Sequence, residues 1–192
     1  MKISGYNKKE KMQHKIKTYL IADTHFDHQR IIDDFGFRPA NFAEQIIKNC
    51  QRMIRPCDRV IHLGDVIWGN KKRLTEILKQ IPGVKTLVRG NHDGAHSDTF
   101  FYEAGFATVC NRIVMKQYIF THWPVQLDVN DDKINIHGHF HNISKSHWEP
   151  QLVDKLGENH YLLSMELNNY HPVDIDTAIE QKKVIKTRDV ED

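Results

Sequence analysis

Five short groups of carboxylate, amide and imidazole side chains occur along the chain, in types and order that suit a metal centre. They are Asp23-Thr24-His25, Gly64-Asp65, Gly90-Asn91-His92-Asp93, Thr121-His122 and Gly138-His139-Phe140-His141. A donor set of this mixture without thiolate favours Mn, Fe, Zn, Co or Ni over Ca or Mg. Together the five groups supply enough ligands for two divalent ions side by side.

The spacing inside the groups also fits a shared site. Asp23 and His25 are two residues apart, as are His139 and His141. In extended backbone, side chains two positions apart point to the same face, so each pair is predicted to face one site. Two ions about 3.5–4 Å apart repel each other, and a bridging carboxylate offsets that repulsion. Asp65 is the candidate bridge.

Hydrophobic periodicity predicts the elements that position these groups. Buried strands are predicted over 18–22, 60–63 and 84–88, with helices over 41–54 and 74–81 between them and a short helix over 97–104. This β-α-β-α-β order implies parallel strands with helical crossovers. In such sheets, ligands gather beyond the carboxyl ends of the strands, where the first three groups lie.

The second half of the chain has a different pattern. Short strands are predicted over 113–115, 118–120, 134–136 and 161–163, with little helix between them. A last helix is predicted near 174–183, after Pro172 and with Asp174 or Asp176 as its cap. The pattern indicates a second, more antiparallel sheet, packed face to face against the first with helices outside.

Composition limits the class of protein. The chain has 192 residues and a formal net charge of +2, too small to indicate nucleic-acid or membrane binding. Apolar runs fall short of the roughly 18 residues of a membrane helix, and no secretory leader is recognised. Three widely spaced cysteines suit a reduced, cytoplasmic protein. We expect one domain over 17–192, preceded by a weakly ordered, lysine-rich segment 1–16 whose role stays open.

As a set, the five groups resemble the motifs of the calcineurin-like metallophosphoesterase superfamily: D-x-H, G-D, G-N-H-[DE], a lone His, and G-H-x-H. The resemblance covers roughly residues 18–142. The residues within the motifs are similar to those of compact bacterial and phage phosphoesterases. It implies an α/β fold, a four-layer α/β/β/α sandwich of two mixed β-sheets flanked by helices. It also implies a metal-dependent hydrolase of phosphoester bonds.

The resemblance further implies a role for each motif residue. Seven side chains would hold two divalent transition-metal ions, with Mn placed ahead of Fe, Zn, Ni or Co. They are Asp23, His25 and His141 for the first ion, Asn91, His122 and His139 for the second, and Asp65 as the bridge. A hydroxide bridging the ions would attack phosphorus, His92 would protonate the leaving group as general acid, and Asp93 would orient His92.

The substrate is less defined. Residues 64–70 lack the arginine of the G-D-x-V-D-R-G pattern of protein phosphatases, which argues against protein phosphatase activity. The resemblance to compact bacterial and phage phosphoesterases implies phosphodiester or nucleotide substrates. The alternatives are a phosphomonoesterase, acting on small molecules or proteins, and a non-catalytic, metal-bound interaction module. Candidate substrate contacts are His28, Arg30, Trp68 and Trp123. The tryptophans either stack on a base or pack the loops, Arg38 either is solvated or contacts phosphate, and the oligomeric state stays open.

Overall fold

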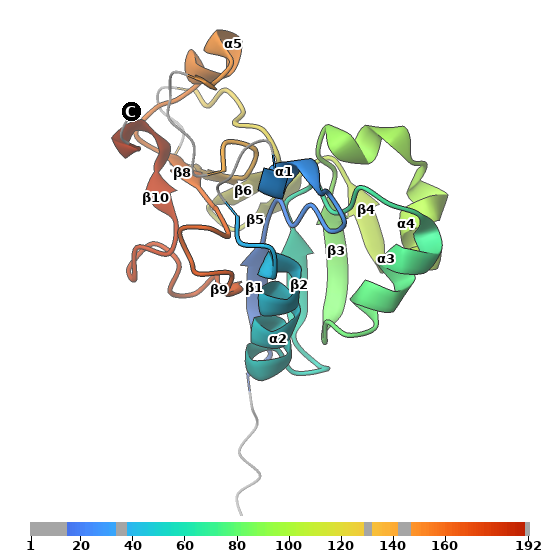
Figure 1. The fold of residues 1–192 in the computed structure, drawn as a ribbon. Coiled ribbons are helices and arrows are strands. Elements are labelled where there is room, and N and C mark those ends of the chain that lie inside the picture. The colour runs from blue at the N-terminus through green and yellow to red at the C-terminus, as the bar shows by residue number, and fades with distance from the viewer. Residues whose placement is uncertain (1–14, 34–37, 129–131, 142–146, 191–192) are drawn as a thin grey trace, which may run out of the picture.

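The computed structural model describes residues 15–33, 38–128, 132–141 and 147–190 (Figure 1). Most of the predicted segment 1–16 therefore lies outside the described residues. Within the described ranges, no helix has the length and apolar character needed to cross a membrane.

The first sheet carries the strands predicted in the first half of the chain. Its order is β4-β3-β2-β1-β9. The strands are β1 (Thr18–Ile21), β2 (Arg59–His62), β3 (Val84–Val88), β4 (Thr108–Cys110) and β9 (Val173–Asp174). The first four run parallel, because a helix crosses over between successive strands, and β9 pairs antiparallel with β1.

Helices cover one face of this sheet, as Figure 1 shows. They are α2 (Phe42–Met53), α3 (Lys71–Leu78) and α4 (Asp98–Ala104). Alternation along the strands decides which side chains meet them: Tyr19 and Ile21 pack under the helices, whereas Leu20 and Ala22 face the other way. A single turn, α1 (Arg30–Asp33), follows β1.

The second sheet has the order β10-β8-β7-β6-β5. Its strands are β5 (Ile113–Met115), β6 (Tyr118–Thr121), β7 (Ile134–His137), β8 (His160–Leu162) and β10 (Ile185–Lys186). The three central strands are parallel, and both outer strands pair antiparallel. The sheet is therefore mixed, with more antiparallel pairing than the first.

Three hydrophobic clusters define the layers. The first lies between the helices and the first sheet, and the second lies between the sheets, where Leu63 and Val88 meet Phe120 and Ile136. The third packs α5 (Pro150–Val153) on the outside of the second sheet through Leu152 and Leu162. The predicted fold class, two mixed sheets flanked by helices, is confirmed.

The predicted helix over 174–183 is wrong. Val173 pairs with Leu20 in β9, and the backbone N–H of Ile175 donates to the carbonyl of Thr18. Turns then occupy 175–182. Val173 and Ile175 are both buried between the sheets. Because they lie two residues apart along the edge of the first sheet, strand pairing overrides the local preference for a helix. Neither Asp174 nor Asp176 caps a helix.

A buried carboxylate, Asp58, ties the start of β2 to the start of β1. Its oxygens accept hydrogen bonds from the backbone N–H of Lys17 at 3.0 Å and of Arg55 at 2.8 Å. The Arg55 guanidinium lies 2.7 Å from Oδ1. These hydrogen bonds, with the side-chain bond to Arg55 the largest cause, hold the pKa of Asp58 well below its usual range.

Replacing this carboxylate therefore tests the junction. We expect Asp58→Asn to lower the free energy of unfolding by about 1–2 kcal/mol at neutral pH, measured by urea denaturation. Because the pKa of Asp58 is depressed in the fold, its contribution is present above the unfolded pKa of about 3.9 and is lost as pH falls below it. The difference between variant and parent should shrink accordingly. Asp132→Asn, at a side chain 91% exposed, is the control and should change little.

Candidate metal centre

All five sequence groups meet at the carboxyl ends of β1, β2, β3, β6 and β7. The two sheets face each other, and hydrogen bonds join the loops that leave their strands. The backbone N–H of Asp23 donates to the carbonyl of Gly64 at 3.0 Å, and that of His25 donates to the carbonyl of Asp65 at 2.9 Å. Across the sheets, the N–H of His139 donates to Asp23 Oδ2 at 3.0 Å.

Five of the predicted ligands adopt left-handed backbone conformations that non-glycine residues rarely adopt. The φ angles lie between 44° and 73° at Asp23, His25, Asp65, His139 and His141. Such conformations are costly and gather where function constrains the backbone. The expectation that the D-x-H and H-x-H pairs converge through extended backbone is wrong for these residues, because turns aim the side chains instead.

Three glycines allow the loops to approach each other closely. A Cβ on Gly90 would lie 2.2 Å from Asp65 Oδ1, and one on Gly138 would lie 2.4 Å from Asp23 Oδ2. A Cβ on Gly64 would lie 2.6 Å from His122 Nδ1. Each glycine thus makes room for a candidate ligand, which agrees with its place directly before a ligand motif.

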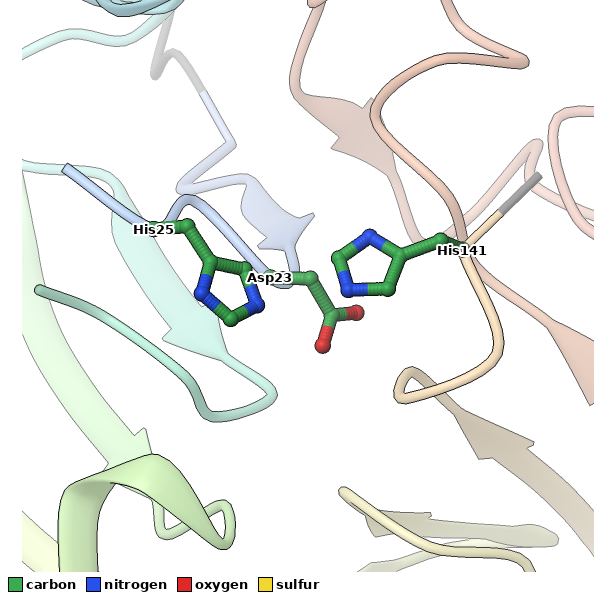
Figure 2. Close-up of side chains that lie close together, drawn as sticks. All are labelled: Asp23, His25 and His141. Carbon is green, nitrogen blue, oxygen red and sulfur yellow. The ribbon is translucent and has the colours of Figure 1, made fainter. Parts of the chain in front are cut away.

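The first donor set is Asp23, His25 and His141, whose ligand atoms lie within 4.8 Å of one another. Figure 2 shows the carboxylate of Asp23 between the two imidazoles. His25 is 3% exposed, and its Nε2 is buried with no hydrogen-bond partner among the described atoms. Burial, aided by the charges of His141 and Arg38, keeps the pKa of His25 well below its usual value. A neutral, unpartnered nitrogen of this kind fits a metal ligand.

The second donor set is Asp65, His122 and His139, again within 4.8 Å. The Nδ1 of His122 lies 2.7 Å from the carbonyl of Leu63, which only accepts, so Nδ1 carries the proton. Its Nε2 then faces Asn91 Oδ1 at 2.9 Å and His139 Nδ1 at 3.2 Å. Several electron-pair donors converging on one point fit a cation between them.

The electrostatics of both sets favour positive charge. Burial raises the pKa of Asp23 to about 6. Burial works against a charged His122, but its hydrogen bond to Asp65 and the charges of Asp23 and Asp65 raise the pKa of His122 to about 9. A divalent cation would stabilise the ionised carboxylates. It would also replace the extra proton that a charged His122 carries.

The carboxylate of Asp65 lies between the two sets. Its Oδ2 is 3.5 Å from His25 Nε2 and 3.4 Å from His122 Nε2. Its Oδ1 accepts a hydrogen bond from the backbone N–H of His92 at 2.9 Å. One oxygen is thus within reach of imidazoles from both donor sets, the position that a bridging ligand needs.

Sequence reasoning missed the carboxylates that orient the last two histidines. Glu166 Oε1 lies 3.3 Å from His141 Nδ1, and Glu149 Oε2 lies 3.1 Å from His139 Nε2. A carboxylate on one ring nitrogen leaves the other for a metal and sets the ring orientation. Both acids follow the histidine motif in the sequence but belong to no motif themselves, so no local signal points to them.

Arg38 is neither solvated nor available to phosphate. Its side chain is fully buried and lies 2.6 Å from Glu166 Oε1. Its guanidinium also donates to the carbonyls of Asp23 and Thr24. Burial opposes ionisation of Glu166, but the hydrogen bond from His141 and the charge of Arg38 lower its pKa. Arg38 therefore links the backbone of the first motif to Glu166, the carboxylate that contacts His141.

His92 lies at the rim of the site, with its side chain 35% exposed and its Nε2 3.9 Å from Asp65 Oδ2. Its ring contacts those of His25 and Trp68. The carboxylate of the neighbouring Asp93 accepts hydrogen bonds from the backbone N–H groups of Asp65, Val66 and Gly90 at 2.8–3.0 Å. Asp93 thus holds the loops on either side of His92 through their backbone.

The four candidate substrate contacts lie around these sets. His28 Nδ1 is 3.2 Å from His25 Nδ1, and the exposed Arg30 is close enough for its charge to lower the pKa of His28, after burial and His92. Trp68 stacks on His28, and Trp123 packs on His122. Trp148, the third tryptophan, is 6% exposed and stacks on Phe140, so it belongs to the core.

Two further histidines are structural. His62 is buried, with Nε2 2.8 Å from Thr24 Oγ1 and Nδ1 accepting from the N–H of Gly64. It joins the first and second motifs through these two contacts. His137 is buried in β7 and contacts the hydroxyl of Thr187 at 2.8 Å.

The fold and donor sets define a metal-dependent hydrolase, and comparison with known proteins agrees. The family described as calcineurin-like phosphoesterase matches residues 16–179, so the chain belongs to this family and is a metal-dependent phosphoesterase. It is 32% identical over 183 residues to an uncharacterized protein of Methanocaldococcus jannaschii, covering 89% of this chain and 96% of that protein.

Solved structures are also similar. A protein of unknown function from Aquifex aeolicus is 26% identical, with a TM-score of 0.64 over 88% of this chain and 100% of the other. The nuclease MPE of Pseudomonas putida matches at a TM-score of 0.48 and 18% identity, over 65% of this chain and 61% of that one.

The close approach at Gly90 gives a test with a matched control. A Cβ in Gly90→Ala would displace the Asp65 carboxylate, so we expect a loss of about 10- to 100-fold in metal affinity with the circular dichroism spectrum retained. In Gly94→Ala, four residues on, the Cβ would meet nothing within 4 Å. Metal content after dialysis should be unchanged in that control. Equal metal retention by both variants would contradict a ligand role for Asp65.

The buried acid behind His141 gives a second test. Glu166→Gln keeps the shape but removes the charge that orients the ring, so we expect metal affinity to fall about 10- to 100-fold. Isothermal titration with Mn²⁺ measures the change. Glu103→Gln removes an exposed carboxylate paired with Lys71 and should bind metal as the parent does. An unaltered isotherm for Glu166→Gln would remove this acid from the metal centre.

Proposed function

We propose that this phosphoesterase works with two divalent ions and hydrolyses phosphodiesters, with nucleotide substrates favoured. The first ion would take Asp23, His25 and His141, and the second would take Asn91, His122 and His139. The observation that carries the proposal is the single oxygen of Asp65, 3.4–3.5 Å from imidazole nitrogens of both sets. Manganese is our first choice among the transition metals, since the donors are imidazole, carboxylate and amide.

The protein's own residues supply the rest of the chemistry. When bound, the ions would neutralise phosphate charge and make water more acidic. His92 is partly exposed at the rim and tied to Asp65 through its backbone N–H, which supports a role for its imidazole in giving a proton to the leaving oxygen. Asp93 positions His92 by fixing the backbone on either side of it.

Arg38 gives no support to a monoester substrate. A monoester carries the greater negative charge and benefits from an added cation at the phosphate. Arg38, which contacts His141, is fully buried and bound to Glu166, so it does not serve that purpose. Residues 64–70 also lack the arginine of the protein-phosphatase pattern.

Metal reconstitution tests the two parts of the proposal separately. Protein stripped with EDTA and reloaded with Mn²⁺ should hold two ions per chain, counted by elemental analysis. It should cleave bis-p-nitrophenyl phosphate faster than p-nitrophenyl phosphate. A single ion at saturation contradicts the dinuclear centre, whereas preference for the monoester contradicts the diester assignment.

His92→Ala tests the general acid. We expect turnover of an alkyl diester to fall by about 10²- to 10⁴-fold with metal content unchanged. The loss should be smaller for a nitrophenyl ester, whose leaving group needs less help from a proton donor. His96→Ala alters a histidine in the same loop that stacks on Phe100, and it should retain activity. Equal losses for both leaving groups would argue against proton donation by His92.

A further inference from the structure

Trp68 presents an exposed aromatic face beside His92. Its side chain is among the exposed large hydrophobic residues, at 55%. One face stacks on His28, with ring centroids 4.6 Å apart and planes at 12°. The ring of His92 meets Trp68 at 64°, with centroids 5.2 Å apart. An indole that is backed on one face and open on the other is ready to stack on a planar group.

The position of Trp68 is fixed relative to the first donor set. Its backbone N–H donates to the carbonyl of Phe26 at 2.8 Å, and Phe26 forms a β-bridge with Ile67. His28, behind the indole, lies 3.2 Å from the ring of His25. The row Trp68, His28, His25 therefore holds the open face at a set place, so little ordering is needed when a ligand stacks.

Trp123 has the matching position at the second donor set. It is 36% exposed, and its ring meets His122 at 84° with centroids 4.9 Å apart. It also contacts His139 at 5.8 Å. Because Trp68 adjoins the first set and Trp123 the second, the two indoles flank the place where phosphate would bind.

We propose, resting on the function proposed above, that Trp68 and Trp123 select a phosphodiester with a nucleobase on each side of the phosphorus. Trp68 stacks on the base of the leaving nucleoside, because it touches His92, the donor to the leaving oxygen. Trp123 stacks on the base of the nucleoside that keeps the phosphate. A monoester has one organic group and leaves one indole unused, so the paired arrangement fits a dinucleotide.

The reaction balances as a simple hydrolysis. The oxygen of water bonds to phosphorus, and the bond from phosphorus to the leaving oxygen breaks. The leaving oxygen takes the proton from His92. The proton released by water goes to solvent, and His92 is reprotonated from solvent. The products are a nucleoside and a nucleoside monophosphate.

A substrate series tests the proposal on the metal-loaded enzyme. The series is thymidylyl-thymidine, the two methyl diesters of thymidine phosphate that lack one base or the other, and dimethyl phosphate. In all four esters the leaving group is an alkoxide of similar basicity. Differences in kcat/KM therefore report how well each substrate is recognised. We expect each lost base to lower kcat/KM by about 5- to 150-fold, the usual range for one base stacked on an aromatic side chain.

Variants assign each base to its indole. Trp68→Ala should lower kcat/KM only for substrates with a base on the leaving side, and Trp123→Ala only for those with a base on the other side. Trp68→Phe keeps a ring and should restore most of the loss. Tyr102→Ala removes an exposed aromatic residue on α4 and should match the parent on all four substrates.

A binding measurement without metal gives an independent readout. The methylphosphonate analogue of thymidylyl-thymidine should quench tryptophan fluorescence, while inorganic phosphate should not, and Trp68→Phe should reduce the quenching. If all four esters are cleaved at equal kcat/KM, or if either alanine variant affects all substrates alike, the pairing of indoles with bases is overturned. If no ester is cleaved with any metal, the proposed function fails instead, and the fluorescence result still decides base binding.

Discussion

The crowding of buried polar donors at the junction of two sheets is the constraint on which this molecule depends. Asp23, His25, Asp65 and His122 are each at most 3% exposed. Removing such groups from water is costly unless partners or ions compensate. Asp23, His25 and Asp65 also have a left-handed backbone conformation, which adds to the free-energy cost. The three hydrophobic clusters stabilise the fold around the donors, and a bound cation would stabilise the donors themselves.

Side chains around the site hold its loops through hydrogen bonds. Asp93 secures the backbone of the loops after β2 and β3, and His62 joins the first loop to the second through Thr24. Arg38 and Glu166 secure the first loop and His141 from behind. These side chains act on backbone groups, on the Thr24 hydroxyl or on a ring nitrogen, so we expect each to affect chemistry through position, within the small tolerances that metal coordination and proton transfer require.

Much of the fold and the candidate site could be predicted because their signals are local. The apolar runs before each motif predicted β1, β2, β3, β6 and β7, and amphipathic spacing predicted α2 and α3. The edge strands β4, β9 and β10 were not predicted. β9 and β10 have two residues each, too few to show a period, and all three strands are defined by pairing with a neighbouring strand. The prediction of a last helix over 174–183 was wrong for a related reason. Val173 and Ile175 are placed by hydrogen bonds with β1, which local sequence does not show. Glu166 was missed because its contact with Arg38 spans 128 residues of sequence.

The sequence by itself determined the chemistry available at each strand end: which ligand types occur, in which order, and with which glycines beside them. Motifs and periods are properties of neighbouring residues, so they can be read without a fold. Tertiary structure decided that the Nε2 of His25 is buried without a hydrogen-bond partner among the described atoms, that turns and not extended strands aim the ligands, and that Asp65 lies between two donor sets. It also decided that Trp68 and Trp123 stay exposed while Trp148 is buried. These outcomes depend on how two sheets pack, and packing joins residues whose separation along the chain carries no signal of their contact.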